Sequence, residues 1–474
     1  MSALNREYII TACRGGPLRP PNQGAHGGAP LQSDAPSPLA GEGGGEGALR
    51  DKLMQTFTQL TIFLILIILL SRAAALLSNR FDLSSVPIQL LVGILLGPSL
   101  LNLLGAPIVL GTWGSISPNL LHSVLKILAE IGLIQLMFLA GLQTDWRRWK
   151  TDLKLIFSLS GWSFVLTAVG ILIVVRWFVD RWTEAFAVSA IMAVSSFGIS
   201  VYNFNEMKLL GSRAANIVLG AAALSGLLAI LLMIASQATH YALLYGAFKM
   251  TIAVSWFVGK LIMFFAISYF LTSRFLNRLA KTAFEKRPRQ TLIGYLLLVA
   301  ALYAWGAVHF GSFAAVGIAS LGGGLLGMSN PGLKEKIEGG FGSSLVSLPM
   351  GILFVVLGME ANFKGIEKEA LFLVVLLLTV TVAKLLGGWL ATRKGFVSSD
   401  QRFPIIVGGL PQGEMGMLIG AYLFSRGLLN PPQFNLAIIV VVILTILTPF
   451  LLRMTPVEYN VQGATVRSAE PRKR

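Results

Sequence analysis

Two carboxylates and three lysines interrupt otherwise apolar stretches of this sequence. The acids are Glu130 and Glu414, and the bases are Lys126, Lys260 and Lys384. An ionisable side chain inside a membrane costs free energy, and by default it marks a substrate pathway or a proton relay. These residues are therefore the first candidates for a site that binds an ion or a proton.

Lys126 and Glu130 are four residues apart, a spacing that brings two side chains to one face of a helix. A structural lysine–glutamate pair and a role in ion binding are both open for them. Lys260 either lines the helix bundle or extends its ammonium toward the membrane surface. A metal centre is not expected, because the chain has one cysteine and its four histidines lack ligand spacing.

The composition indicates that the surrounding elements are membrane helices. The 474 residues are 54% hydrophobic and 13% charged, whereas soluble domains hold about 25% charged residues. This excludes a soluble globular protein, a disordered chain and a disulfide scaffold. The net charge of +16 is compatible with nucleic-acid binding, but the bases cluster in short loops between apolar segments, as membrane orientation requires.

The first 53 residues differ from the rest of the chain. Residues 1–52 hold ten glycines and six prolines with no apolar run, so they cannot bury a core. We expect 1–53 to be either a disordered tail or an extension upstream of a natural start at Met54. No secretory signal peptide is recognisable there.

Thirteen later segments are apolar and long enough to be membrane spans. We expect an all-α integral membrane protein with spans at roughly 57–77, 86–104, 121–142, 153–178, 184–203, 212–236, 250–272, 291–310, 313–328, 342–361, 369–391, 403–424 and 433–453. With the N-terminus outside, twenty-four basic residues fall on the inner side and six on the outer. This bias predicts an outer N-terminus and a cytoplasmic C-terminus.

The spans form two halves that resemble one another. Residues 138–146 at the end of span three match 355–363 at the end of span ten, and the glycine-broken stretches 93–98 and 322–327 also correspond. Matching spans lie seven apart, so they cross the membrane in opposite senses. The predicted organisation is a first repeat, a link with a basic loop, a second repeat and a short cytoplasmic tail, over 54–236, 237–290, 291–453 and 454–474.

Spans five and twelve are both interrupted, by Ser195-Ser196-Phe197-Gly198 and by 408–414, which includes Pro411 and Gln412. Paired broken helices in an inverted repeat point to a substrate site near the membrane midplane. The alternative is that glycine and proline are simply common in membrane helices, where small residues allow close packing.

Four stretches in order resemble the monovalent cation:proton antiporters, the family of sodium/proton and potassium-efflux exchangers. They are GILLGPSL at 93–100, LAEIGLIQLMFLAGLQTDW at 128–146, IVLGAAALSGLL at 217–228 and GGLPQGEMGMLIG at 408–420. The resemblance covers about residues 56–453. It implies a thirteen-helix inverted-repeat fold with crossing broken helices, a homodimer, a bundle that moves against a dimer scaffold, and no cofactor.

The chain departs from the family at its ion site. The family carries an aspartate, often after a second acidic or polar residue, at the positions that Ser225 and Gly226 occupy here. Glu414 matches a late acidic position that usually follows an arginine, which is Gln412 in this chain. Lys384 matches a lysine that faces the aspartate in the family, so we expect it to pair with Glu414 instead. A purely structural pair and a titrating Lys384 are the alternatives.

Three functions follow from these residues. The first is exchange of sodium or potassium for protons across the bacterial inner membrane, with Glu414 and Lys384 assisted by hydroxyls of Ser195, Ser196 and Ser225. The second is a divergent transporter of another solute, because a lysine without the aspartate would also suit an anion or a neutral molecule. The third is a membrane sensor or subunit that does not transport. No motif indicates an enzyme.

Overall fold

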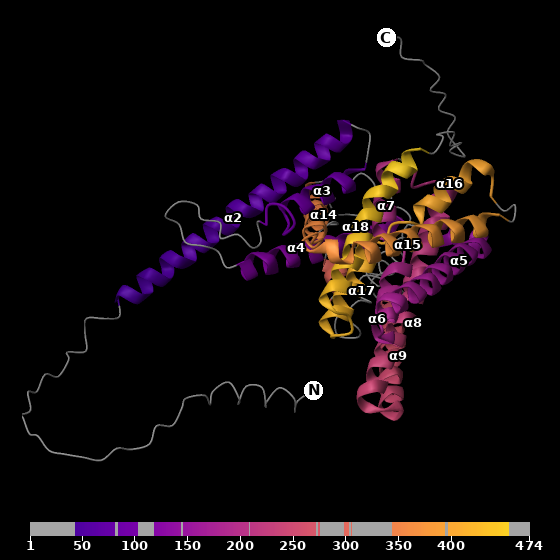
Figure 1. The fold of residues 1–474 in the computed structure, drawn as a ribbon. Coiled ribbons are helices and arrows are strands. Elements are labelled where there is room, and N and C mark those ends of the chain that lie inside the picture. The colour runs from indigo at the N-terminus through magenta and orange to yellow at the C-terminus, as the bar shows by residue number, and fades with distance from the viewer. Residues whose placement is uncertain are drawn as a thin grey trace, which may run out of the picture. The chain divides into compact units, whose positions relative to one another are not determined.

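The structure is a computed structural model that describes residues 43–80, 84–102, 118–143, 146–207, 209–271, 274, 298–302, 305, 344–393 and 397–454. Within these residues the regular secondary structure is helical and contains no strand (Figure 1). The chain divides into two units, Met1–Leu53 and Met54–Arg474. All the functional residues discussed below belong to the second unit.

The described helices follow the chain in a simple order. They are α2 (Gly43–Arg80), α3 (Ser85–Leu96), α4 (Pro118–Gln143), α5 (Trp146–Phe178), α6 (Trp182–Ala193), α7 (Gly198–Glu206), α8 (Arg213–Tyr245), α9 (Ala247–Phe270), α14 (Ser344–Met359), the short η3 (Ile366–Glu369), α15 (Ala370–Thr392), α16 (Ser399–Gly408), α17 (Gly413–Ser425) and α18 (Pro431–Arg453).

The predicted all-α membrane class is confirmed. Eleven of the thirteen predicted spans coincide with described helices, counting α6–α7 and α16–α17 as one span each. The span expected at 313–328 falls outside the described residues, and within 291–310 only 298–302 and 305 are described, so the number thirteen stays a prediction. Six helical segments in the described part of the chain are long and apolar enough to cross a membrane: Leu60–Ser78, Trp149–Phe178, Trp182–Glu206, Arg213–Tyr245, Ile366–Thr392 and Pro431–Arg453.

The predicted interruptions of spans five and twelve are both present. Helix α6 ends at Ala193, Val194 is extended, and α7 begins at Gly198. Helix α16 ends at Gly408, and α17 begins at Gly413, whose φ of +38° favours glycine. Pro411 lies in this second break and has no backbone N–H to continue a helical ladder.

Helices α3, α4 and α14 pack closely through glycines. A Cβ on Gly93 of α3 would lie 2.8 Å from the Cα of Gly358 on α14 and would also meet the backbone of Val355. A Cβ on Gly132 of α4 would meet the backbone carbonyl of Pro349 on α14. Small residues permit this approach between helix backbones, which is how membrane helices gain contact.

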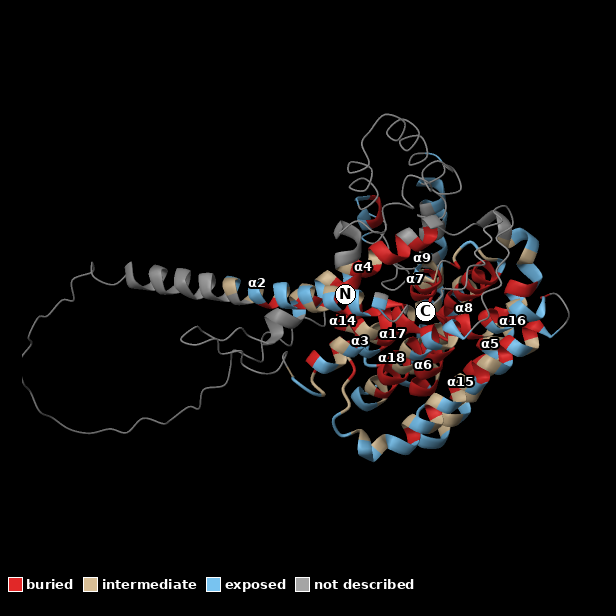
Figure 2. Cartoon of the chain, turned by 90° about the horizontal axis from the view of Figure 1, so that it is seen from above, coloured by how far each residue is buried: buried red, intermediate tan, exposed pale blue. Residues whose placement is uncertain are grey.

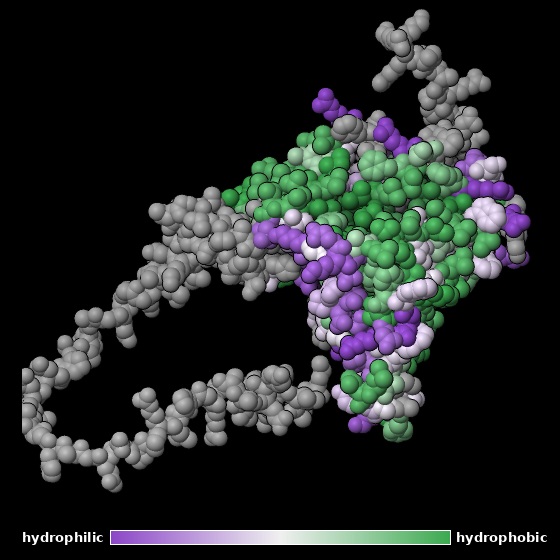
Figure 3. Space-filling model, viewed as in Figure 1, coloured by the Kyte–Doolittle hydropathy of each residue, from purple (hydrophilic) through white to green (hydrophobic). Residues whose placement is uncertain are grey.

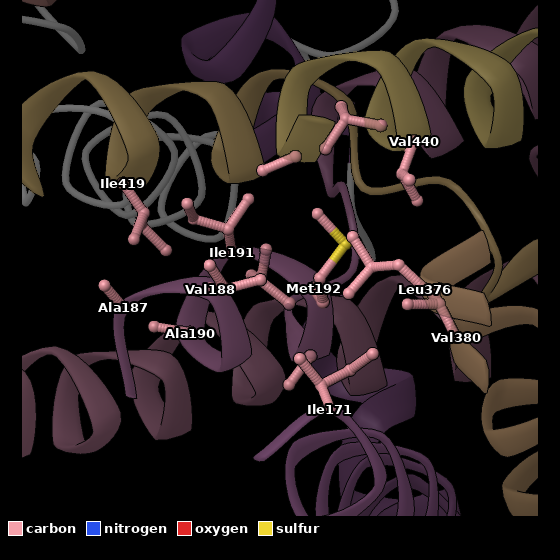
Figure 4. Packing of buried hydrophobic residues seen from close by; sticks show 14 of the residues in the cluster. Ile171, Ala187, Val188, Ala190, Ile191, Met192, Leu376, Val380, Ile419 and Val440 are labelled. Atoms are coloured by element: carbon pink, nitrogen blue, oxygen red, sulfur yellow. The ribbon is translucent and has the colours of Figure 1, made fainter. Parts of the chain in front are cut away.

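The helices around the breaks share a second apolar core. Side chains from α5, α6, α15, α17 and α18 meet there, and Figure 4 shows Ile171, Ile191, Leu376, Ile419 and Val440 pointing toward one another. Helix α6 is buried along most of its length, whereas α5 and α15 expose their outer faces (Figure 2). These outer faces are apolar, and the view in Figure 3 shows a broad hydrophobic surface, as a lipid environment requires.

Candidate functional site

The two helix breaks lie directly against each other. The backbone N–H of Ser196 in the first break donates to the carbonyl of Pro411 in the second at 2.7 Å. The side-chain amide of Gln412 donates to the carbonyl of Met192, near the C-terminal end of α6, at 2.6 Å. Backbone groups that a broken helix leaves unpaired inside a membrane need such partners. Each break therefore supplies hydrogen-bond partners to backbone groups at the other.

Glu414 binds the N-terminal end of α7. Its side chain is 1% exposed and lies in the first turn of α17. One carboxylate oxygen accepts from the backbone N–H of Gly198 at 2.8 Å, and the other accepts from the hydroxyl of Ser196 and from the N–H of Ile199 at 3.4 Å. The N-terminal ends of α7 and α17 each carry about half a positive charge, so one carboxylate neutralises both.

Lys384 on α15 lies at the C-terminal ends of the other two half-helices, α6 and α16. Its side chain is 1% exposed. The ammonium lies 2.8 Å from the carbonyl oxygen of Val194 at the end of α6, and 3.3 and 3.4 Å from those of Gly409 and Leu410 after α16. It also donates to the hydroxyl of Ser195 at 3.1 Å. The C-terminal ends of α6 and α16 carry partial negative charge, which the ammonium neutralises.

The expected pairing of Lys384 with Glu414 is wrong. Both residues are described, and no ion pair joins them: the ammonium donates to the carbonyl of Val194, and the carboxylate accepts from the N–H of Gly198. The physical reason is the position of the helix ends. Two N-terminal ends attract the carboxylate and two C-terminal ends attract the ammonium, so each charge is stabilised by backbone dipoles rather than by the other charge.

Ser225 and Gly226 on α8 lie beside the first break. The hydroxyl of Ser225 accepts from the backbone N–H of Ser195 at 3.0 Å and donates to the carbonyl of Ala222 at 2.8 Å. Gly226 is buried, and a Cβ there would meet only the terminal methyl of Met415, at 3.1 Å. Ser225 and Gly226, the positions where the family resemblance predicts an acidic residue, therefore lie beside the crossing of the two helix breaks but carry no charge.

A small cavity opens next to the lysine, with room for about one water molecule. Four serines line it together with Lys384, namely Ser160, Ser163, Ser195 and Ser225. The hydroxyl of Ser160 is buried without a hydrogen-bond partner. Sequence reasoning missed Ser160 and Ser163. Their three-residue spacing, which places them on one face of α5, is the signal that was available.

Lys126 and Glu130 are not part of this crossing. Both lie on α4 and are exposed in the described chain, and no ion pair joins them. The interpretation as a structural pair on one helix face is therefore not supported by their geometry. Among the described residues, no group of three or more histidine, cysteine, aspartate or glutamate side chains is arranged to hold a metal ion.

Known antiporters resemble this chain in sequence and in fold. The chain is 24% identical to the "Probable Na(+)/H(+) antiporter GerT" of Bacillus cereus, over 82% of this chain and 97% of that protein. It is also 24% identical to the "Na(+)/H(+)-K(+) antiporter GerN" of the same organism, over 82% of this chain and 94% of that protein. Its fold resembles the sodium proton antiporter MjNhaP1 of Methanocaldococcus jannaschii with a TM-score of 0.61 and 14% identity, covering 83% and 95% of the two chains. The family model described as sodium/hydrogen exchanger, transmembrane, matches residues 64–455, and the protein belongs to that family.

Proposed function

We propose that this protein exchanges a monovalent cation, sodium or potassium, for protons across the bacterial inner membrane. The observation that carries the proposal is the crossing of two interrupted helices around one buried carboxylate and one buried ammonium, Glu414 and Lys384. Irregular backbone at membrane depth marks the substrate sites of secondary transporters. The family and the names of the relatives support cations and protons as the substrates.

The site residues have distinct roles in this proposal. Glu414 and Lys384 are the ionisable groups at the crossing. The hydroxyls of Ser195, Ser196 and Ser225 position the two breaks, because they form hydrogen bonds that join the first break to the second break, to α17 and to α8 respectively. Gln412 holds the second break to the end of α6. Because a cation and a proton carry the same charge, a site that holds one at a time can exchange them.

Alternating access completes the proposal. The crossing must open to one side of the membrane at a time, and in transporters with inverted repeats this occurs when one bundle rocks against another. The distribution of basic residues supports an outer N-terminus and a cytoplasmic C-terminus. A homodimer is proposed from the family resemblance.

Proton movement in inside-out membrane vesicles tests the function. Pulses of sodium, potassium and lithium chloride are added to vesicles that hold a pH gradient, from mildly acidic to mildly alkaline conditions. We expect at least one cation to collapse the gradient. If none does at any pH in this range, the protein is not a cation:proton antiporter.

Glu414→Gln tests the role of the carboxylate in the same assay. Glutamine keeps the shape of the side chain but removes the charge that faces two helix N-termini, and we expect exchange to be lost. Glu367→Gln is the matched control, because Glu367 lies in the exposed η3 segment and has no place in the site. Unaltered exchange by the Glu414 variant would refute the role given to this residue.

A further inference from the structure

A cluster of polar side chains joins the C-terminal end of α7 to the N-terminal end of α3. The carboxylate of Glu206 accepts from the backbone N–H of Ser85 at 2.7 Å and from the Ser85 hydroxyl at 2.9 Å. The same hydroxyl lies 3.0 Å from the hydroxyl of Tyr202. The neighbouring Ser84 hydroxyl donates to the side-chain carbonyl of Asn203 at 2.8 Å. We call these five residues the α3–α7 junction.

Helix α7 connects this junction to the crossing of the two helix breaks. Its first residue, Gly198, donates its backbone N–H to Glu414, and its last residue, Glu206, binds Ser85. The helix has nine residues and is therefore about 13 Å long, a little under half the hydrocarbon thickness of a membrane. One short helix thus transmits any movement of the junction to the crossing.

Helix α3, on the other side of the junction, is held against α14. A Cβ on Gly93 of α3 would lie 2.8 Å from the Cα of Gly358 on α14, so the two backbones are in close contact. At the far end of α3, the Ser99 hydroxyl donates to the carbonyl of Ala361 at 2.9 Å and accepts from the N–H of Phe363 at 2.9 Å. Both groups follow α14 directly. The junction therefore connects the helices that carry the breaks to the closely packed pair α3 and α14.

The chemistry of the junction suits a contact that opens and closes. The Glu206 side chain is exposed, so water can replace its bonds to Ser85 when the two helix ends separate. Asn203 is 0% exposed, and its side-chain amino group has no hydrogen-bond partner in the structure. A buried donor without a partner is costly, and water would satisfy it in an open junction. Strong charge-assisted bonds are thus combined with a cost that opening removes.

We propose that the α3–α7 junction is a latch that closes the crossing on the cytoplasmic side and opens once in each transport cycle. This rests on the proposed function, because alternating access requires one group of helices to separate from another on one side of the membrane. The side follows from the proposed orientation. Arg80 precedes α3 and Arg213 follows α7, and basic residues next to spans favour the cytoplasm.

A disulfide across the latch tests the proposal in inside-out vesicles. Ser84→Cys and Asn203→Cys are combined with Cys13→Ser, which removes the one native cysteine, and the Ser84 and Asn203 side chains are already in contact. Oxidation should abolish cation:proton exchange, and a reductant should restore it. The same protein is measured before and after oxidation, so a folding defect cannot produce this result. Complete cross-linking that leaves exchange unaltered would overturn the proposal.

Thr183→Cys combined with Thr239→Cys, also in the Cys13→Ser background, is the matched control. The two threonine hydroxyls lie 3.3 Å apart and belong to α6 and α8, which both adjoin the first break. A disulfide there joins two helices on the same side of the latch, and exchange should persist. Equal loss of exchange in the control pair would count against the latch.

Access to the crossing provides a readout that does not depend on exchange or on disulfide formation. Gly226→Cys with Cys13→Ser places a thiol beside the first break, where a Cβ meets only the methyl of Met415 at 3.1 Å. Adding Glu206→Ala should speed the labelling of this thiol by a membrane-impermeant maleimide from the cytoplasmic face. We expect about tenfold or more, because charged hydrogen bonds that hold the closed state are lost.

Asp400→Ala, at the exposed start of α16, is the control for the loss of a carboxylate and should leave labelling unchanged. Labelling that Glu206→Ala leaves unchanged, or speeds only from the outer face, would overturn the latch. Exchange by the native chain without faster labelling of the variant refutes the latch alone. Faster labelling of the variant, in a protein whose native chain shows no exchange, refutes the antiport function alone.

Discussion

The hydroxyl of Ser225 accepts a hydrogen bond from the backbone N–H of Ser195 at 3.0 Å. This bond joins α8 to the break between α6 and α7. Ser225 is 3% exposed, so water cannot replace the bond readily. The serine thus satisfies a buried backbone group of the first break.

Ser225→Ala should destabilise the site and slow exchange. The substitution leaves the Ser195 N–H buried without an acceptor, which costs about 1–3 kcal/mol. The expected readouts are a lower thermal-unfolding midpoint in detergent and a reduced exchange rate in vesicles. Ser225→Thr retains the hydroxyl and should preserve most of both. Equal behaviour of the two variants would show that the bond does not matter.

Gly226→Asp should be accommodated and should increase cation affinity. A Cβ at this position meets only the flexible methyl of Met415, at 3.1 Å, and the carboxylate would add a negative charge beside the crossing. We expect tighter cation binding and faster exchange in the vesicle assay. Gly226→Ala provides the control for added volume without charge. If the aspartate and alanine variants exchange at the same rate, the charge has no effect at this position.

The helix breaks could be predicted from sequence because they depend on local chemistry. Gly198, Pro411 and Gly413 are residues that end or redirect a helix, and each lies within an apolar stretch of spanning length. The end of α3 is less regular. The span was expected to reach 104, but α3 stops at Leu96, because Gly97 is extended and Pro98 cannot continue the ladder.

The partners within the site could be predicted only in part. Glu414 and Lys384 stand out because an ionisable residue in an apolar segment is rare. The sequence does not show which helix ends approach each charge, and for that reason the expected ion pair between them was wrong. Ser160 was missed because serine is common in membrane helices, where its hydroxyl can bond the preceding turn. Only the packing of α5 on α15 and α8 brings it to the cavity.

Glu206→Ala should weaken the junction between α7 and α3. The Glu206 carboxylate accepts from the backbone N–H of Ser85 at 2.7 Å and from its hydroxyl at 2.9 Å, and it places negative charge at the N-terminal end of α3. Loss of these charged hydrogen bonds should cost about 1–3 kcal/mol, seen as a lower unfolding midpoint. Asp400→Ala, at the exposed start of α16, is the comparison. An equal effect of the two substitutions would argue against a specific role for Glu206.

Gly387→Ala should disrupt the contact between α15 and α5, which carry Lys384 and Ser160. A Cβ on Gly387 would lie 2.6 Å from the backbone nitrogen of Ser163 and would press on its Cα. Backbone atoms cannot yield as a flexible side chain does, so the helices must separate, at a cost of about 1–3 kcal/mol.

Gly161→Ala on α5 is the control, because a Cβ there meets nothing within 4 Å and alanine favours a helix by up to about 1 kcal/mol relative to glycine. The unfolding midpoint should fall for Gly387→Ala and hold or rise for Gly161→Ala. Because the separation would also widen the serine-lined cavity, exchange by Gly387→Ala should fall below that of Gly161→Ala at a temperature where both variants are folded. Unchanged stability of the Gly387 variant would mean that α5 and α15 are not packed this closely.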